Sequence, residues 1–155
     1  MNYAIKIVIA AGLLTGIVLF IPGGARAGEV AVIANPSVQA DSLDKKRLFS
    51  VYRGEVRSWE DGTKIKVWDL GERGETKETF YDYLGIRPSR MKSLWMKQLL
   101  TGEGEPPDEV DSQDDMIKKV MATPGSIGYV DKEKVGSGVK LLLLIDKKES
   151  KKPDK

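Results

Sequence analysis

Short apolar runs alternate with helix-like segments along most of this chain, and that alternation restricts the folds open to it. The run VAVIA at residues 30–34 stops at an Asn-Pro pair, which predicts a buried strand. Residues 64–68 alternate polar and apolar side chains, and residues 127–130 and 139–145 are further strand candidates. Because residues 141–145 of the second candidate are apolar on both faces, we expect that strand to lie centrally in a sheet.

Four amphipathic segments separate these runs and predict helices. Ser42 can cap the first helix, and Ser112 with Asp115 forms a capping-box pattern at the start of the fourth. The second helix is expected to stop at Gly85, and the third is expected to begin at Pro88. The apolar stripe of the third helix is made of Met91, Leu94, Trp95 and Leu99.

Strands and helices that alternate in this way predict one α/β domain, at residues 28–146, with a mainly parallel or mixed sheet flanked by helices. The segment TGEGEPPDEVD at residues 101–111 is rich in Gly, Pro and acidic residues and predicts a loop. The end of the chain, KKESKKPDK at residues 147–155, has five lysines against two acidic residues and predicts a basic disordered tail.

The first 27 residues have the three parts of a secretory signal peptide. Lys6 precedes an apolar run at residues 7–21, and Ala25-Arg26-Ala27 supplies a cleavage end of the A-x-A type. The run is shorter than the roughly 20 residues that a spanning helix needs, and an uncleaved N-terminal anchor is the alternative. Cleavage after Ala27 would leave a chain that is not stably inserted in a membrane. We expect this mature chain to be located in the periplasm.

The side chains that most often carry out catalysis are missing from this sequence. It has no histidine and no cysteine, which removes the commonest general base, the thiolate nucleophile and the usual zinc ligands. The acid pairs Asp108/Glu109 and Asp114/Asp115 fall in a predicted loop and a first helical turn, where solvated charge explains them. Basic and acidic residues nearly balance, at 25 and 23, which argues against nucleic-acid binding. We therefore expect a protein that is not an enzyme and has no metal or cofactor.

Three stretches resemble the phosphate-type periplasmic substrate-binding proteins of ABC transporters. LDKKRLFSVYRGEVRSWEDG (43–62) is similar to their helix, glycine and tryptophan segment, and ETFYDYLG (78–85) resembles the helix after their phosphate loop. ATPGSIGYVD (122–131) resembles their Pro-Gly-x-Ile-Gly-Tyr turn and strand. In that family the three stretches belong to the second lobe of a two-lobed clamp. The resemblance therefore implies a single lobe, like one half of a type 2 periplasmic binding protein.

The turn DLGERGETKETF (69–80) departs from the family at the positions that hold phosphate. The family pattern resembles Arg-x-x-Gly-Ser-Gly-Thr. Thr76 falls on its threonine, whereas Gly74 replaces its serine and Glu75 its second glycine. Arg73 is the only nearby substitute for its arginine. A negative charge at Glu75 disfavours a bound anion, although a glutamate in the first turn of a helix also suits the helix dipole.

The resemblance implies a binding-type module that takes up a phosphate-like oxyanion weakly. An anion would be held by backbone N–H groups at the start of the second helix and by neighbouring side chains. A homodimer closing over this turn would supply the wall that the absent first lobe provides in the family. The residues expected to form the site are Arg73, Gly74, Thr76 and Lys77.

The second hypothesis is an envelope protein-interaction domain that has lost its ligand. Such a domain would expose an apolar patch in place of a polar pocket. The residues near which we look for that patch are Trp59, Trp68 and Met96. Burial of Trp59 and Trp68 in the core would count against it, and Trp95 is expected to be core in either case.

Overall fold

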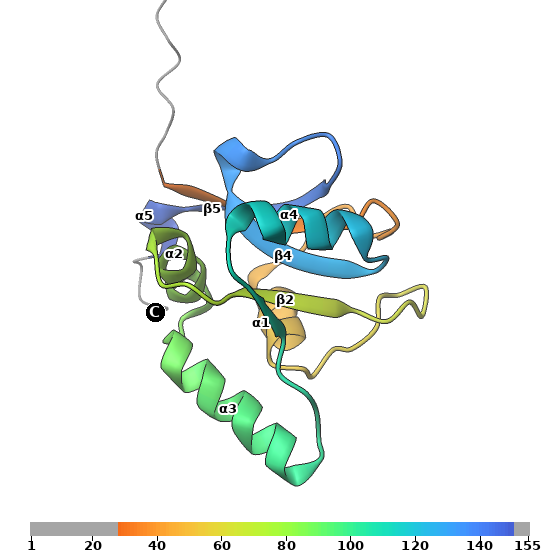
Figure 1. The fold of residues 1–155 in the computed structure, drawn as a ribbon, viewed down its shortest axis with the longest axis vertical. Coiled ribbons are helices and arrows are strands. Elements are labelled where there is room, and N and C mark those ends of the chain that lie inside the picture. Colours follow the sequence, from red (N-terminus) through yellow and green to blue (C-terminus); the bar gives the residue numbers. More distant parts are fainter. Residues whose placement is uncertain (1–27, 151–155) are drawn as a thin grey trace, which may run out of the picture.

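The computed structural model describes residues 28–150, which form a five-stranded sheet with helices on both faces (Figure 1). The predicted signal peptide and residues 151–155 of the predicted tail lie outside the described residues. The longer elements are β1 (Glu29–Ala34), α1 (Lys45–Tyr52), β2 (Lys66–Leu70), α2 (Glu75–Leu84), α3 (Pro88–Thr101), β3 (Asp108–Val110), α4 (Gln113–Ala122), β4 (Ser126–Asp131) and β5 (Lys140–Asp146). A 3-10 turn η1 (Lys132–Lys134) and a short helix α5 (Lys147–Ser150) complete the described chain.

The sheet is mixed, with strand order β3-β2-β4-β1-β5. β2 runs parallel to both of its neighbours, β3 and β4, while β1 runs antiparallel to β4 and β5. The connections from β2 to β3 and from β3 to β4 pass through helices, as parallel pairing requires. The expected α/β fold with a mixed sheet is confirmed.

Two adjacent residues of β4 show how the helices cover the two faces. Gly128 faces α4, because a Cβ at that position would collide with the Sδ atom of Met116. Tyr129 points the opposite way, as the next residue of a strand must. Its ring stacks on Phe80 of α2, with 3.9 Å between centroids, and lies 6.2 Å from the ring of Tyr52 in α1. The sheet is therefore sandwiched between α4 on one face and α1 with α2 on the other.

The helix ends largely follow the sequence signals. Gly85 caps α2 in the left-handed region, at φ 77°, and Pro88 is the first residue of α3, as predicted. The predicted cap of α1 was wrong. Asp44, two residues after Ser42, takes the N-cap position, where its carboxylate accepts a hydrogen bond from the N–H of Arg47 at 2.7 Å.

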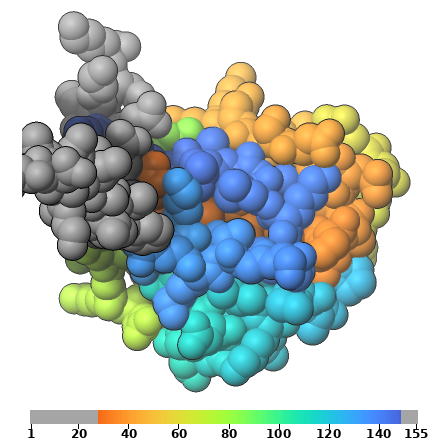
Figure 2. Space-filling view, turned by 90° about the horizontal axis from the view of Figure 1, so that it is seen from above, coloured from red at the N-terminus to blue at the C-terminus, as the bar shows by residue number. Residues whose placement is uncertain are grey.

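The prediction that residues 139–145 form a central strand is wrong. β5 pairs only with β1 and lies at the edge of the sheet. A bulge in this pairing leaves Leu142 opposite no β1 residue, so buried side chains recur every three residues, at Leu142 and Ile145. Leu141 and Leu144 are 41% and 38% exposed. Figure 2 shows the C-terminal part of the chain, in blue, on the surface of the molecule.

Two segments predicted to be irregular contain short elements. The predicted loop at 101–111 includes β3, which pairs with β2 in the register Trp68↔Asp108, Asp69↔Glu109 and Leu70↔Val110. β3 forms because the edge of β2 offers unpaired backbone groups to residues 108–110. No local sequence pattern predicts this pairing. The predicted disordered tail begins with α5, whose residues Lys147–Ser150 pack near α2.

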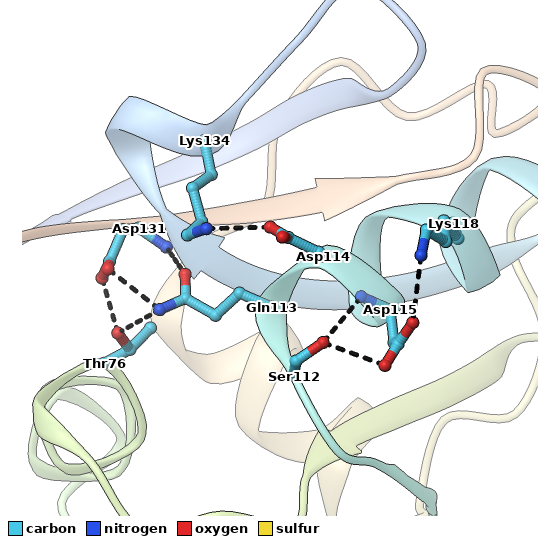
Figure 3. Close-up of polar contacts among 8 residues, drawn as sticks. All are labelled: Thr76, Ser112, Gln113, Asp114, Asp115, Lys118, Asp131 and Lys134. Carbon is cyan, nitrogen blue, oxygen red and sulfur yellow. Dashed lines mark hydrogen bonds and ion pairs between the residues drawn. The ribbon is translucent and has the colours of Figure 1, made fainter.

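Ser112 caps α4 as the capping-box pattern predicts, and this cap gives a first prediction. Ser112 Oγ accepts a hydrogen bond from the N–H of Asp115 at 3.1 Å and lies 2.9 Å from its carboxylate, to which it donates (Figure 3). We expect Ser112→Ala to lower the free energy of unfolding by about 1 kcal/mol, because one N–H at the helix start loses its partner. Urea denaturation measures this loss. Ser112→Thr keeps the hydroxyl and should stay near wild type; equal losses in both variants would contradict the assignment.

Candidate functional site

The turn predicted to hold an anion connects β2 to α2 and is framed by two glycines. Gly71 donates its N–H to the carbonyl oxygen of Val110 at 2.9 Å, which ties the end of β2 to β3. Gly74 occupies the N-cap position of α2 in an extended conformation, and no side chain caps the helix. The start of α2 therefore keeps backbone N–H groups without a side-chain partner, which is the kind of element that holds oxyanions in proteins.

Thr76, which falls on the phosphate-binding threonine of the resembled family, has its hydroxyl engaged inside the protein. Its Oγ1 donates to Asp131 Oδ1 at 2.5 Å and accepts from Gln113 Nε2 at 3.0 Å (Figure 3). Gln113 also donates to Asp131 Oδ2 at 2.9 Å and accepts from the N–H of Asp131 at 2.6 Å. A hydroxyl has one proton, so the Thr76 hydroxyl cannot donate to an added anion while it is bonded to Asp131.

Lys77 is paired inside the protein in the same way. Its Nζ lies 3.0 Å from Asp69 Oδ2 and also donates to the carbonyl oxygen of Leu70. The Asp69 side chain is 1% exposed and that of Lys77 12% exposed. The Tyr129 hydroxyl donates to Asp69 Oδ1 at 2.6 Å, and its pKa is raised well above the usual value, by burial first and then by the charge of Asp69. An added anion would therefore have to compete with a buried carboxylate for Lys77.

Glu75 and Thr76 line a small recess of about 160 Å³ on one side of the turn. The Glu75 carboxylate pairs with Lys147 of α5. The other acidic residues that line the recess are Glu29, Asp131 and Glu133. Carboxylates gathered in this way disfavour a phosphate, since like charges repel at short distance. The sequence-based concern about the negative charge of Glu75 therefore extends to the whole recess.

The other side of the turn borders an open cleft of about 440 Å³. Three of the four predicted site residues line it, namely Arg73, Gly74 and Lys77, and Thr76 is not among them. Two further cations, Arg87 and Lys92, reach the cleft from the start of α3. The acidic residues on its walls are Asp69, Glu78 and Glu109. Sequence reasoning missed Arg87 and Lys92; the short connection between α2 and α3 was the only signal that placed them near the turn.

The two acid pairs singled out in the sequence, Asp108/Glu109 and Asp114/Asp115, form surface ion pairs. Asp108 pairs with Lys66 at 2.5 Å, and Asp114 pairs with Lys134 at 2.8 Å (Figure 3). Glu109 lies 3.9 Å from the Nζ of Lys92. Among residues 28–150, no group of three or more acidic side chains is arranged to hold a metal ion. In the same part of the chain, no helix has the length and apolar character needed to cross a bilayer.

The fold is similar to that of phosphate-binding proteins of known structure. An ABC-type phosphate transport receptor from Vibrio cholerae is 18% identical, with a TM-score of 0.58 over 73% of this chain. A putative phosphate ABC transporter substrate-binding protein with bound phosphate, from Clostridium perfringens, is 15% identical, with a TM-score of 0.61 over 73%. PstS from Borrelia burgdorferi is 20% identical, with a TM-score of 0.56 over 74%.

This chain spans less than half of each of these proteins, covering 44%, 43% and 47% of their lengths. No family model matches the sequence, and a comparison with curated proteins finds no match. The structural similarity shows the fold of a single lobe, of the kind found in phosphate ABC transporter substrate-binding proteins. The predicted fold class is confirmed by it.

Proposed function

We propose that this protein is a secreted, periplasmic binding module without catalytic activity, related to the substrate-binding proteins of phosphate transporters. In this proposal it binds phosphate-like oxyanions weakly, in the cleft beside the start of α2. The observation that supports weak binding is the internal pairing of Thr76 with Asp131 and of Lys77 with Asp69. Thr76 and Lys77, the side chains expected to bind an anion strongly, are already bonded to carboxylates of the same chain.

The groups that an anion could reach are the exposed cations of the cleft, Arg73, Arg87 and Lys92, of which Lys92 also lies 3.9 Å from Glu109, and the N–H groups at the start of α2. Exposed ion contacts contribute at most about 1 kcal/mol each, because water and salt screen them. A helix N-terminus adds about 0.3–1 kcal/mol. Together these contributions reach about 4 kcal/mol, which corresponds to a Kd of about 1 mM.

Titration of the protein with phosphate, followed by amide chemical shifts in NMR, tests this proposal. We expect a Kd of about 1 mM and shift changes around Arg73 and Gly74. Arg73→Gln should weaken binding about fivefold, since it removes one exposed contact. Thr76→Val and Glu75→Gly should leave the Kd unchanged, because both side chains face the recess instead of the cleft. Micromolar affinity, or loss of binding in Thr76→Val, would contradict the proposal.

A second copy closing over the cleft would supply the opposite wall of a clamp, and we include this homodimer in the proposal. Exclusion of water from the cleft would strengthen each ionic contact. Light scattering of the protein with and without phosphate measures the mass directly. Phosphate-dependent doubling of the mass would support closure by a second copy. The mass of a single chain both with and without phosphate would contradict the homodimer.

The alternative hypothesis, an envelope protein-interaction domain, requires exposed apolar surface. Trp59 and Trp68 are only 4% and 8% exposed, so neither supplies it. The Trp59 side chain also donates a hydrogen bond to the carbonyl oxygen of Gly125 at 2.8 Å, inside the protein. Trp95 is 5% exposed, as predicted. Met96 is 47% exposed and is the one of the three proposed patch residues that favours a surface role.

A further inference from the structure

The outward side of α3 combines exposed apolar and cationic side chains. Met96, Leu99 and Leu100 are 47%, 47% and 81% exposed, and they are the most exposed group of large apolar side chains that neighbour one another in the described chain. Their spacing of three and four residues places them side by side on one helix surface. Leu99 had been expected in the buried stripe with Met91 and Trp95, which are indeed buried.

The charges of α3 all have one sign. Its sequence, PSRMKSLWMKQLLT, has three cations and no acidic residue. Arg90 and Lys97 are exposed and lie almost in line along the helix, on the flank next to Leu100, whereas Leu99 lies on the opposite flank of the exposed side. Lys92 is exposed too, but it also borders the cleft and lies near Glu109. We call Arg90, Met96, Lys97, Leu99 and Leu100 the α3 outer face.

The inner side of α3 is fixed to the rest of the protein. Trp95 Nε1 donates to the carbonyl oxygen of Tyr52 at 2.7 Å, and Gln98 Nε2 donates to that of Arg53 at 2.8 Å. Figure 1 shows α3 lying away from the sheet, at one end of the molecule, with its chain returning from the helix end toward β3. One side of the helix is therefore held by α1, and the opposite side is open to a partner.

We propose that the α3 outer face docks the protein on an anionic lipid surface, without insertion across the bilayer. A helix with apolar residues flanked by Arg and Lys is the kind of element that binds at the interface of such a membrane. A flat surface needs only the outer side of the helix, whereas a groove in a protein would have to surround a helix already held by α1. A second copy of α3 would bring like charges together. The inference does not rest on anion binding in the cleft.

Flotation of the chain spanning residues 28–155 with lipid vesicles tests the inference. The sheet, the core and α3 all lie within residues 28–150, so this chain keeps the fold and excludes the predicted leader. We expect binding to phosphatidylglycerol vesicles, release by added salt, and no binding to phosphatidylcholine vesicles. Equal binding to both lipids, or binding to neither, would overturn the inference.

Paired variants locate the surface. Arg90→Gln with Lys97→Gln should lower the vesicle partition coefficient about 25-fold, at about fivefold for each charge lost. Leu100→Ser should lower it about tenfold, and its 81% exposure means that folding is not affected. The matched control, Lys46→Gln with Lys118→Gln, removes the same charge from exposed positions on α1 and α4. If the control weakens binding as much as the α3 pair, net charge and not the α3 outer face is responsible, and the inference fails.

Light scattering distinguishes a second copy from lipid. The protein without lipid should have the mass of one chain, and Leu100→Ser should not change it. A dimer that Leu100→Ser dissociates, together with no flotation on phosphatidylglycerol, would assign the α3 outer face to self-association and overturn the lipid inference. Phosphate titration of the same variants separates this result from the proposed function, because Arg90 and Lys97 do not line the cleft.

Discussion

Asp69→Asn is expected to lower the free energy of unfolding by about 3–5 kcal/mol. Asp69 is almost fully buried, and its two oxygens accept from Lys77 and from the Tyr129 hydroxyl. Asparagine has nearly the same size but no charge, so the ammonium of Lys77 would stay in a largely buried position without its counter-ion. Urea denaturation followed by tryptophan fluorescence measures the change.

Two variants test whether the loss comes from the pair. Asp82→Asn removes an exposed carboxylate from α2 and should change stability by less than about 0.5 kcal/mol. Asp69→Asn combined with Lys77→Met removes both charges and should be more stable than the sum of the two single losses predicts. Additive losses, or wild-type stability in Asp69→Asn, would show that the pair does not hold the turn in place.

Alkaline conditions are expected to unfold this protein steeply above about pH 10. Burial, and then the negative charge of Asp69, raise the pKa of Tyr52, Tyr81 and Tyr129 above the usual tyrosine value. A raised pKa in the folded state means that the unfolded chain loses these protons first as pH rises. The stabilisation is therefore complete below about pH 10 and declines above it, by about 1.4 kcal/mol per pH unit for each tyrosine and about 4 kcal/mol for the three.

Absorbance of tyrosinate and near-ultraviolet circular dichroism, recorded along one pH titration, measure this effect. The three buried tyrosines should ionise in the same cooperative step in which tertiary structure is lost. Tyr81→Phe is the informative variant, because the Tyr81 hydroxyl is buried with no hydrogen-bond partner among the described residues. This variant should fold well and reduce the slope of stability against pH by about 1.4 kcal/mol per unit. Ionisation of these tyrosines before unfolding would refute the expected linkage.

Several parts of the fold could be predicted because their signals are local. The strand at 30–34, the stop of α2 at Gly85, the start of α3 at Pro88 and the capping box at Ser112 each depend on residues within a few positions of one another. The resemblance added the lobe type, which the structural similarity confirms. The position of β5 was not predictable in this way. An apolar run predicts a buried strand, but it does not indicate which strands pair with it.

In the candidate site, too, the sequence predicted the local arrangement but not the tertiary contacts. The sequence placed Arg73, Gly74, Thr76 and Lys77 on one turn before a helix, and the structure keeps them there. It does not keep them on one surface, since Thr76 faces the acidic recess and the others line the cleft. Residues adjacent on a helix point in different directions, and which direction meets a cavity depends on the elements packed around it.

The sequence by itself determined the order of the four longer helices and of β1, β2, β4 and β5, most of the helix ends, and the lack of histidine and cysteine side chains. Only the tertiary structure decided that Thr76 bonds to Asp131, 55 residues away, and that Lys77 is neutralised by Asp69. It also decided that β5 is an edge strand and that α3 keeps an open apolar and basic side. The physical reason is that helix and turn signals act between near neighbours, whereas pairing of charges and exposure of a face depend on which distant segments the fold brings together.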